Sequence, residues 1–301
     1  MSGFPNTTTY SSLVDEIISN LRGYTSTPDQ MTSLTTAITA TTERLKVDDI
    51  AEVSKGVIEI DSELIYVKSV DTTASEAVSK TTWRGFRGTL AEPHVVGATV
   101  TYSPLFPRSV VEREINNVIL AIYPLVFGVK TFEFTPTGSV PQFDLPVGAS
   151  RVMDVDMYLN QFAGWERLRS WDVRQKAGLP SLTGIQLDLF GKFLVNHIIR
   201  VLYASAPTPL VNPADVFTTV TGLPESAKDI IVFGVQWRLA QNLDLARLPV
   251  TAVEADELGQ PRAVGSAMSI SSTFYKLYQQ ALERERTRLN ELFPARIHLV
   301  R

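Results

Sequence analysis

The stretch from Ile58 to Val100 reads IEIDSELIYVKSVDTTASEAVSKTTWRGFRGTLAEPHVVGATV. Its first residues alternate apolar and acidic side chains, which is the two-residue period of a β-strand, and the chain then turns near Asp61 into the apolar run LIYVKSV. Gly85 and Gly88 punctuate the later WRGFRGT segment and predict a tight turn with positive φ at glycine. The stretch therefore predicts a β-hairpin, a turn unit and a further strand, without a visible catalytic centre.

The composition is that of an ordinary folded protein. The chain has 301 residues, of which 44% are apolar and 20% charged, and its net charge is −4 at pH 7. This charge argues against nucleic acid or an acidic membrane as the main partner, because phosphate binding needs a basic face. The absence of cysteine excludes disulfides, thiolate metal sites and a cysteine nucleophile. The first residues show no signal-peptide pattern and no apolar run reaches the roughly 20 residues of a membrane span, so we expect a soluble protein made in a reducing cytosol.

Four segments show the three- and four-residue apolar spacing of helices. The first is expected to start with a cap at Ser11 or Ser12, and the second to kink or end early at Pro124. The helices are expected at roughly residues 10–22, 108–127, 224–247 and 272–293.

Two β-rich blocks lie between these helices. The sequence predicts an α+β fold in which a helical bundle of about four helices carries two antiparallel β insertions, the second sandwich- or barrel-like because its strand candidates are short and evenly spaced. The expected parts are an N-terminal bundle helix (1–28), the first insertion (29–105), a bundle helix (106–128), the second insertion (129–213), two C-terminal bundle helices (214–294) and an extended tail (295–301).

Side chains that could carry chemistry are scattered. The three histidines have no metal-ligand spacing, and no nucleophile elbow or phosphate-binding loop is present. Carboxylates cluster as Glu59, Asp61 and Glu63 and as Asp154 and Asp156, a pattern more typical of the solvent face of a strand than of an acid–base pair. We expect no catalytic residue, metal site or cofactor, and predict that the chain is not an enzyme.

Aromatic residues and the C-terminal tail leave alternatives open. Tyr158, Phe162, Trp165 and Trp171 could form a sugar-stacking platform, although aromatic side chains at strand spacing more often lie in a core. The tail 295–301 alternates apolar and polar residues, so it either adds a strand to a partner's sheet or frays.

Three motifs carry a resemblance to a known family. The first joins ELIYV at Glu63–Val67, WRGFRGTLAEPH at Trp83–His94 and GATV at Gly97–Val100 in a strand–RGxxGT–H–G pattern similar to one found widely in phage structural proteins. The second is GLPESAKD at Gly222–Asp229 before an apolar helix, and the third is the charged late helix STFYKLYQQALERERTRL. Together they resemble head-to-tail connector (adaptor) proteins of long-tailed bacteriophages.

The resemblance implies a structural protein of the virion neck, made in the host cytoplasm. Such adaptors form a ring, usually dodecameric, between the portal and the tail stopper, terminator or tail tube, and DNA passes through the channel without sequence-specific binding or any membrane partner. The helical bundle and the tail would contact the portal. The tail residues expected to do so are Arg296, Ile297, His298, Leu299 and Arg301.

Contacts between neighbouring copies are expected at charged residues of the first insertion and the last helix, namely Arg84, Arg87, His94, Arg284 and Arg288. Two other functions remain as alternatives. One is a carbohydrate- or receptor-binding protein of the tail tip that uses the aromatic residues of the second insertion. The other is a hydrolase that acts through Asp154, Asp156 or Glu63, which requires a pocket that unites these carboxylates.

Overall fold

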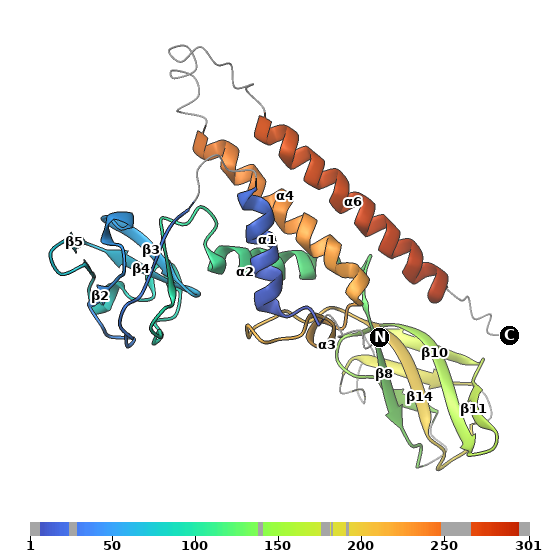
Figure 1. Cartoon of the computed structure of the whole chain (residues 1–301). Coiled ribbons are helices and arrows are strands. Elements are labelled where there is room, and N and C mark those ends of the chain that lie inside the picture. The colour runs from blue at the N-terminus through green and yellow to red at the C-terminus, as the bar shows by residue number, and fades with distance from the viewer. Residues whose placement is uncertain are drawn as a thin grey trace, which may run out of the picture. The chain divides into compact units, whose positions relative to one another are not determined.

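The computed structural model describes residues 7–23, 29–137, 141–175, 181, 183–190, 193–247 and 266–294. These residues form an α+β fold with four small antiparallel sheets, and none of these sheets closes into a barrel (Figure 1). The α+β prediction is therefore confirmed. The chain divides into two compact units, one made of Met1–Tyr10, Asn116–Gly234 and Thr273–Arg301 and the other of Ser11–Ile115 and Val235–Ser272.

The first two helices agree closely with the apolar periodicity. Helix α1 (Tyr10–Arg22) buries one stripe of apolar side chains, and helix α2 (Arg108–Ala121) starts after Pro107. Helix α2 ends before the cis Tyr123–Pro124 peptide, so the early end predicted from proline is confirmed. The predicted cap at Ser11 or Ser12 is wrong, because α1 already begins at Tyr10 and both serines lie within its first turn.

The remaining helices follow the second β-rich block. A short helix α3 (Phe217–Thr221) precedes the 3-10 turn η4 (Glu225–Ala227), which leads into α4 (Lys228–Arg247). Helix α6 (Ser266–Leu292) starts six residues before the expected position and ends two residues before Pro294. Among the described helices none is long and apolar enough to cross a membrane.

Each unit brings parts of three helices together. In the unit that contains residues 116–234 and 273–301, a Cβ atom added to Gly234 of α4 would lie 2.9 Å from Val118 Cγ1 of α2 and 3.1 Å from the Tyr278 ring of α6. In the other unit, Arg108 of α2 pairs with Asp15 of α1 at 2.5 Å, and Arg238 of α4 lies 3.4 Å from Glu114 of α2. Helix packing thus contributes to the core of each unit.

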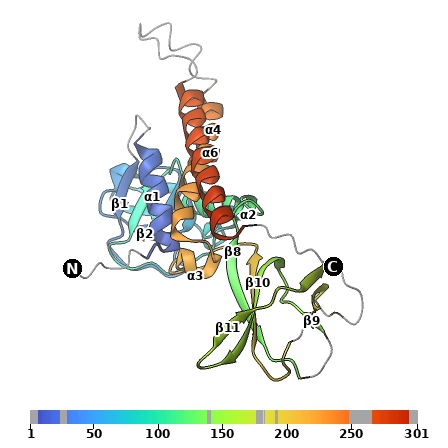
Figure 2. The ribbon, with the colours of Figure 1, turned by 90° about the vertical axis from the view of Figure 1, so that its right-hand side faces the viewer.

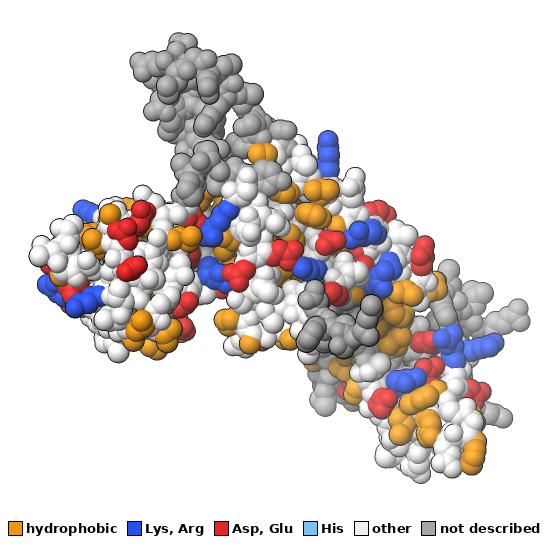
Figure 3. All heavy atoms as spheres, viewed as in Figure 1, with side chains coloured by type: hydrophobic (Ala, Val, Ile, Leu, Met, Phe, Trp, Pro, Cys, Tyr) orange, Lys and Arg blue, Asp and Glu red, His pale blue; other side chains and the backbone are white. Residues whose placement is uncertain are grey.

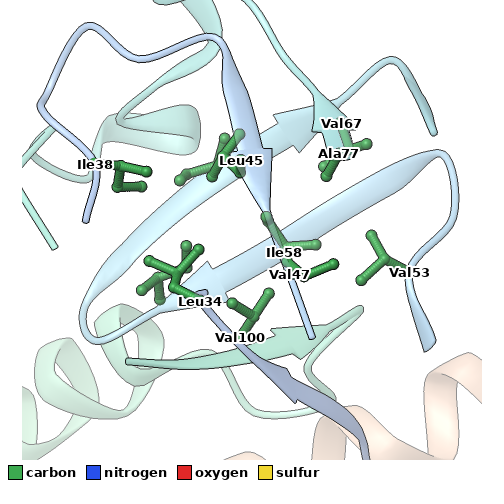
Figure 4. Packing of buried hydrophobic residues seen from close by; sticks show 11 residues of the cluster. Leu34, Ile38, Leu45, Val47, Val53, Ile58, Val67, Ala77 and Val100 are labelled. Carbon is green, nitrogen blue, oxygen red and sulfur yellow. The ribbon is translucent and has the colours of Figure 1, made fainter. Parts of the chain in front are cut away.

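The first β module, which we define as residues 29–105, contains two sheets. One has the order β1-β7-β3-β4 and the other β2-β6-β5. Their strands are β1 (Gln30–Ser33), β7 (Thr99–Tyr102), β3 (Gly56–Ile60), β4 (Glu63–Val67), β2 (Arg44–Lys46), β6 (Glu76–Val78) and β5 (Ser69–Asp71). Leu45 and Ala77 from one sheet and Ile58, Val67 and Val100 from the other belong to one core (Figure 4).

The predicted hairpin in this module is confirmed. Strand β3 pairs with β4 in antiparallel register from Gly56↔Val67 to Ile60↔Glu63, and the turn uses Asp61 at φ +54°. Three 3-10 turns complete the module, namely η1 (Ile50–Glu52), η2 (Thr81–Trp83) and η3 (Phe86–Gly88).

The second β module, which we define as residues 128–205, also contains two sheets with one shared core. The orders are β11-β10-β14-β8 and β12-β13-β9. The strands are β8 (Gly128–Phe134), β9 (Gln142–Asp144), β10 (Ala149–Asn160), β11 (Gly164–Arg167), β12 (Trp171–Gln175), β13 (Ile185–Leu189) and β14 (Ile199–Ser205). Val155 and Val201 of the first sheet share the core with Trp171 and Leu187 of the second. Figure 2 labels β8, β10 and β11 of the first sheet and β9 of the second.

Candidate functional site

The densest group of charged side chains in the first β module is the ion pair of Glu63 and Arg84. Glu63 lies at the start of β4, and Arg84 follows η2 in the glycine-punctuated turn. Two parallel bonds of 2.7 Å join the guanidinium Nε and Nη2 to the two carboxylate oxygens. The Arg84 and Glu63 side chains are 0% and 1% exposed. Such a two-bond geometry holds both planar groups in one orientation.

Backbone groups complete the surroundings of this ion pair. The Glu63 carboxylate also accepts hydrogen bonds from the N–H groups of Gly85 (2.9 Å) and Glu92 (3.1 Å). The guanidinium donates to the carbonyl oxygens of Glu92 (2.8 Å) and Thr39 (2.5 Å). Because these partners lie in separate segments, one ion pair fixes the turn, the following loop and the start of β4 together.

His94 adds a third buried charged group. Its Nδ1 lies 2.7 Å from an Asp61 carboxylate oxygen and its Nε2 lies 2.8 Å from Glu63 Oε2. Since a carboxylate only accepts, both ring nitrogens donate when the ring is protonated. Burial alone would lower the pKa of His94, but the hydrogen bonds that its ring donates to Glu63 and Asp61 outweigh burial and raise the pKa. Burial likewise would raise the pKa of Glu63, yet Arg84 and His94 lower it to about 2.

The backbone of Gly85 and the side chains around it stabilise the turn. Gly85 has φ +63°, and a Cβ atom there would lie 2.6 Å from the Thr89 carbonyl oxygen, so the turn requires glycine. Thr89 Oγ1 accepts from the backbone N–H of Leu64 at 3.0 Å. The Trp83 and Phe86 rings pack on Tyr66 at 5.3 and 5.6 Å between centroids. The predicted turn with positive φ at glycine is confirmed.

Two of the three charged residues predicted to contact a neighbouring subunit from this module are buried. Arg84 and His94 were expected at a surface between subunits, but both are buried and bonded within the first β module. Their role as inter-subunit contacts is therefore withdrawn, and we assign them to holding the loop. Arg87 is exposed and lies over the Phe86 ring at 5.6 Å, so its expected role remains a prediction.

The carboxylates of the hairpin also differ from expectation. Asp61 is exposed, whereas Glu59 and Glu63 are 6% and 2% exposed, so the solvent-face interpretation is wrong for these two. Glu59 Oε1 accepts from the N–H of Arg108 at 2.6 Å and so caps the start of α2. Burial raises the pKa of Glu59 to about 7, although the hydrogen bond and charge of Arg108 act in the opposite direction.

Other predicted contact residues lie elsewhere. Arg284 and Arg288 are on α6, where Arg284 pairs with Asp229 of α4 at 2.9 Å and Arg288 pairs with the buried Glu285 at 2.5 Å. Both guanidinium groups remain partly exposed, and their contact with a neighbouring copy remains a prediction. The five portal-contact residues of the tail, Arg296 to Arg301, lie outside the described residues.

The carboxylates proposed for a hydrolase do not form one catalytic group. Asp154 pairs with Arg167, and Asp156 lies 3.3 Å from Arg200, so each has its own cation on the surface of the second β module. Glu63 belongs to the other unit, where Arg84 binds it. Among the described residues no cluster of three or more His, Asp or Glu side chains could hold a metal ion.

The four aromatic residues proposed as a sugar platform do not all lie on one exposed surface. Trp171 is buried in the core of the second β module. Trp165 packs against Tyr158, and the Arg200 guanidinium lies 4.0 Å from the centre of its ring. Phe162 is 92% exposed at the β10–β11 turn. Trp171 therefore belongs to the core and not to an exposed platform, as spacing on strands favoured.

The sequence did not single out the exposed apolar residues near the buried cluster. Leu90, Val95 and Val96 are 72%, 72% and 61% exposed, and they flank the buried His94. The signal was present as an apolar loop between a glycine-rich turn and a strand, but apolar residues in a sequence ordinarily predict burial.

Comparison with known proteins adds no family. No model of a known protein family matches the chain, and no curated protein matches its sequence.

Proposed function

We propose that the chain is a head-to-tail adaptor of a long-tailed bacteriophage, which assembles into a ring between the portal and the tail and leaves a channel for DNA. The observation that carries the proposal is the alternation of helices with two separate β modules. Each module has its own two sheets and its own hydrophobic core, and each is preceded and followed by a helix.

This order is the one expected of a helical bundle with two β insertions. Supporting it, α2 and α4 contribute to the helix packing of both units, together with α6 in one and α1 in the other. The two sheets with one core in the second module are consistent with the sandwich-like insertion. Insertions built in this way can vary in size without disturbing the helices that carry them.

The charges support a structural role. The most buried charged cluster fixes a turn, and its carboxylate, guanidinium and imidazole groups bind one another. A net charge of −4 suits a channel through which DNA slides, because a basic lining would retain the phosphates. The portal, the tail stopper or terminator and the tail tube are the proposed partners, and the virion neck is the proposed location.

Deletion of the gene from the phage genome that carries it tests the role. The proposal predicts DNA-filled heads and separate tails in electron micrographs, with tailed particles restored by the gene supplied in trans. Tailed, infectious particles without the gene would overturn the proposal. Normal tailed particles that fail to adsorb would instead favour the receptor-binding alternative.

A further inference from the structure

The loop that follows the glycine-punctuated turn exposes three large apolar side chains. Within residues 84–96 the charged Arg84 and His94 are buried and Arg87 and Glu92 are exposed, while Leu90, Val95 and Val96 are 72%, 72% and 61% exposed. A buried charge and an exposed group of large apolar side chains are the two informative departures from ordinary burial. An apolar surface of this kind in a folded chain marks an interaction site.

The buried cluster holds this loop from its inner side. Glu92 donates its N–H to Glu63 and accepts from Arg84 through its carbonyl group. The backbones of His94 and Ile38 bond each other twice, both at 2.9 Å, and Gly97 N–H donates to the Leu34 carbonyl at 2.8 Å. Because the loop is fixed before any partner arrives, binding through it loses little conformational entropy.

A second exposed apolar surface lies at one end of the second β module. The end of β10 lies beside the start of β14, since Tyr158 N–H donates to the Ile198 carbonyl at 2.8 Å. The loop between β13 and β14 reaches the same end, because Leu194 N–H lies 3.3 Å from Met157 Sδ of β10. The exposed apolar side chains of this end, which we call the apolar end, are Phe162, Trp165, Leu194, Val195 and Ile198. Figure 3 shows exposed hydrophobic side chains on both β modules.

The sizes of these two surfaces are suited to a contact between them. The loop exposes on the order of 300 Å² of apolar surface and the apolar end on the order of 500 Å², each as large as the largest patch of a typical monomer. Two carboxylates near the apolar end are paired, Asp156 with Arg200 and Asp154 with Arg167, whereas Glu166 beside Trp165 and Glu92 within the loop are exposed. The apolar side chains would therefore form the centre of an interface, with these two glutamates at its polar rim. Burying both gives the core of an interface near the lower size limit of about 1,200 Å² once its polar rim is added.

We propose that the loop of residues 90–96 in one copy binds the apolar end of the second β module in a neighbouring copy. This inference rests on the proposed ring, because a ring is built from a contact between two different surfaces of the same chain. The chain carries two such surfaces, one in each β module. The occupant of each is thus a second copy of this chain.

The lack of native cysteine makes this contact directly testable in the full-length chain. We would prepare Val95→Cys and Phe162→Cys as separate variants, mix them, and oxidise the mixture with copper phenanthroline. As a matched control, Val95→Cys is mixed with Val147→Cys, because Val147 is 84% exposed but precedes the opposite end of β10. All three positions are exposed, so circular dichroism should show unchanged folding.

The inference predicts at least ten times more mixed dimer from Val95→Cys with Phe162→Cys than from the control mixture. Adding Leu90→Asp to the Val95→Cys variant should abolish that excess, because it places a charge in the apolar contact. Equal yields in both mixtures, or an excess that Leu90→Asp leaves unchanged, would overturn the inference. The cross-linking result does not depend on the result of the gene deletion. The two experiments therefore distinguish failure of the proposed interface from failure of the proposed adaptor role.

Discussion

Replacing Arg84 with methionine should destabilise the first β module more than any surface change in the same loop. The substitution removes two bonds to the Glu63 carboxylate and those to the Glu92 and Thr39 carbonyl groups. Glu63 would remain buried with only His94 as a charged partner. Removal of one member of a buried ion pair costs about 3–5 kcal/mol.

Hydrogen exchange measured by mass spectrometry is the assay, because it reports the local stability of the first β module within the full-length chain. A loss of about 3 kcal/mol corresponds to roughly 150-fold faster exchange through opening of the module. Peptides that cover residues 58–67 and 83–96 should show this acceleration in Arg84→Met. The matched control is Arg87→Met, which removes an exposed arginine three residues away and should stay within about 0.5 kcal/mol of the wild type.

Comparable protection of these peptides in Arg84→Met and Arg87→Met would refute the structural role assigned to the buried pair. The double variant Glu63→Gln/Arg84→Met offers a second check. It removes the unpaired buried charge, so it should be less destabilised than the sum of its two single variants.

Three further predictions address the other features. Between pH 5 and 8 the wild type should lose stability, because the unfolded chain deprotonates Glu59 near pH 4.5 whereas the folded chain keeps the proton to about pH 7. In thermal unfolding, the Tm of Glu59→Gln should decrease less over this pH range than the Tm of the wild type. An identical decrease in Tm would contradict the burial of this carboxyl group. Gly234→Ala should lower Tm by about 2–4 °C in calorimetry, since overpacking outweighs the gain in helix propensity, and a raised Tm would refute the close helix contact. Trp171→Ala should cost about 3–5 kcal/mol in urea unfolding and Trp165→Ala less than about 1 kcal/mol, so a reversed order would contradict the placement of these rings.

Glu63 and His94 change the stability of the first β module in opposite directions with pH, so unfolding measured across a pH range distinguishes their contributions. The lowered pKa of Glu63 gives stability that is present above about pH 4.5 and is lost as the pH falls toward 2. The raised pKa of His94 gives stability that is complete below about pH 6.5 and is lost as the pH rises through the folded value. The first module should therefore be most stable in mildly acidic solution.

Features set by local sequence were predictable. The alternation before Asp61 gave the β3–β4 hairpin, and the apolar stripe of residues 10–22 gave α1 with both ends correct. Proline placed the end of α2. Each of these depends on residues a few positions apart, whose spacing and backbone limits are visible in the sequence.

Features set by distant contacts were not predictable. Arg84 looked like a surface residue because it follows no apolar pattern, and its partner Glu63 is 21 positions away. Glu59 looked solvent-exposed because it alternates with isoleucine, but β3 is buried on both faces where α2 begins. The exposure of Leu90, Val95 and Val96 was also not predicted from the sequence, because the backbone of their loop is held by hydrogen bonds to residues far away in the sequence.

The measurement that tests the adaptor role most directly is negative-stain imaging of the full-length chain mixed with the portal protein of the same genome. A head-to-tail adaptor should appear as a ring with a central channel attached to one end of the portal. Isolated monomers or trimers beside bare portals would contradict it.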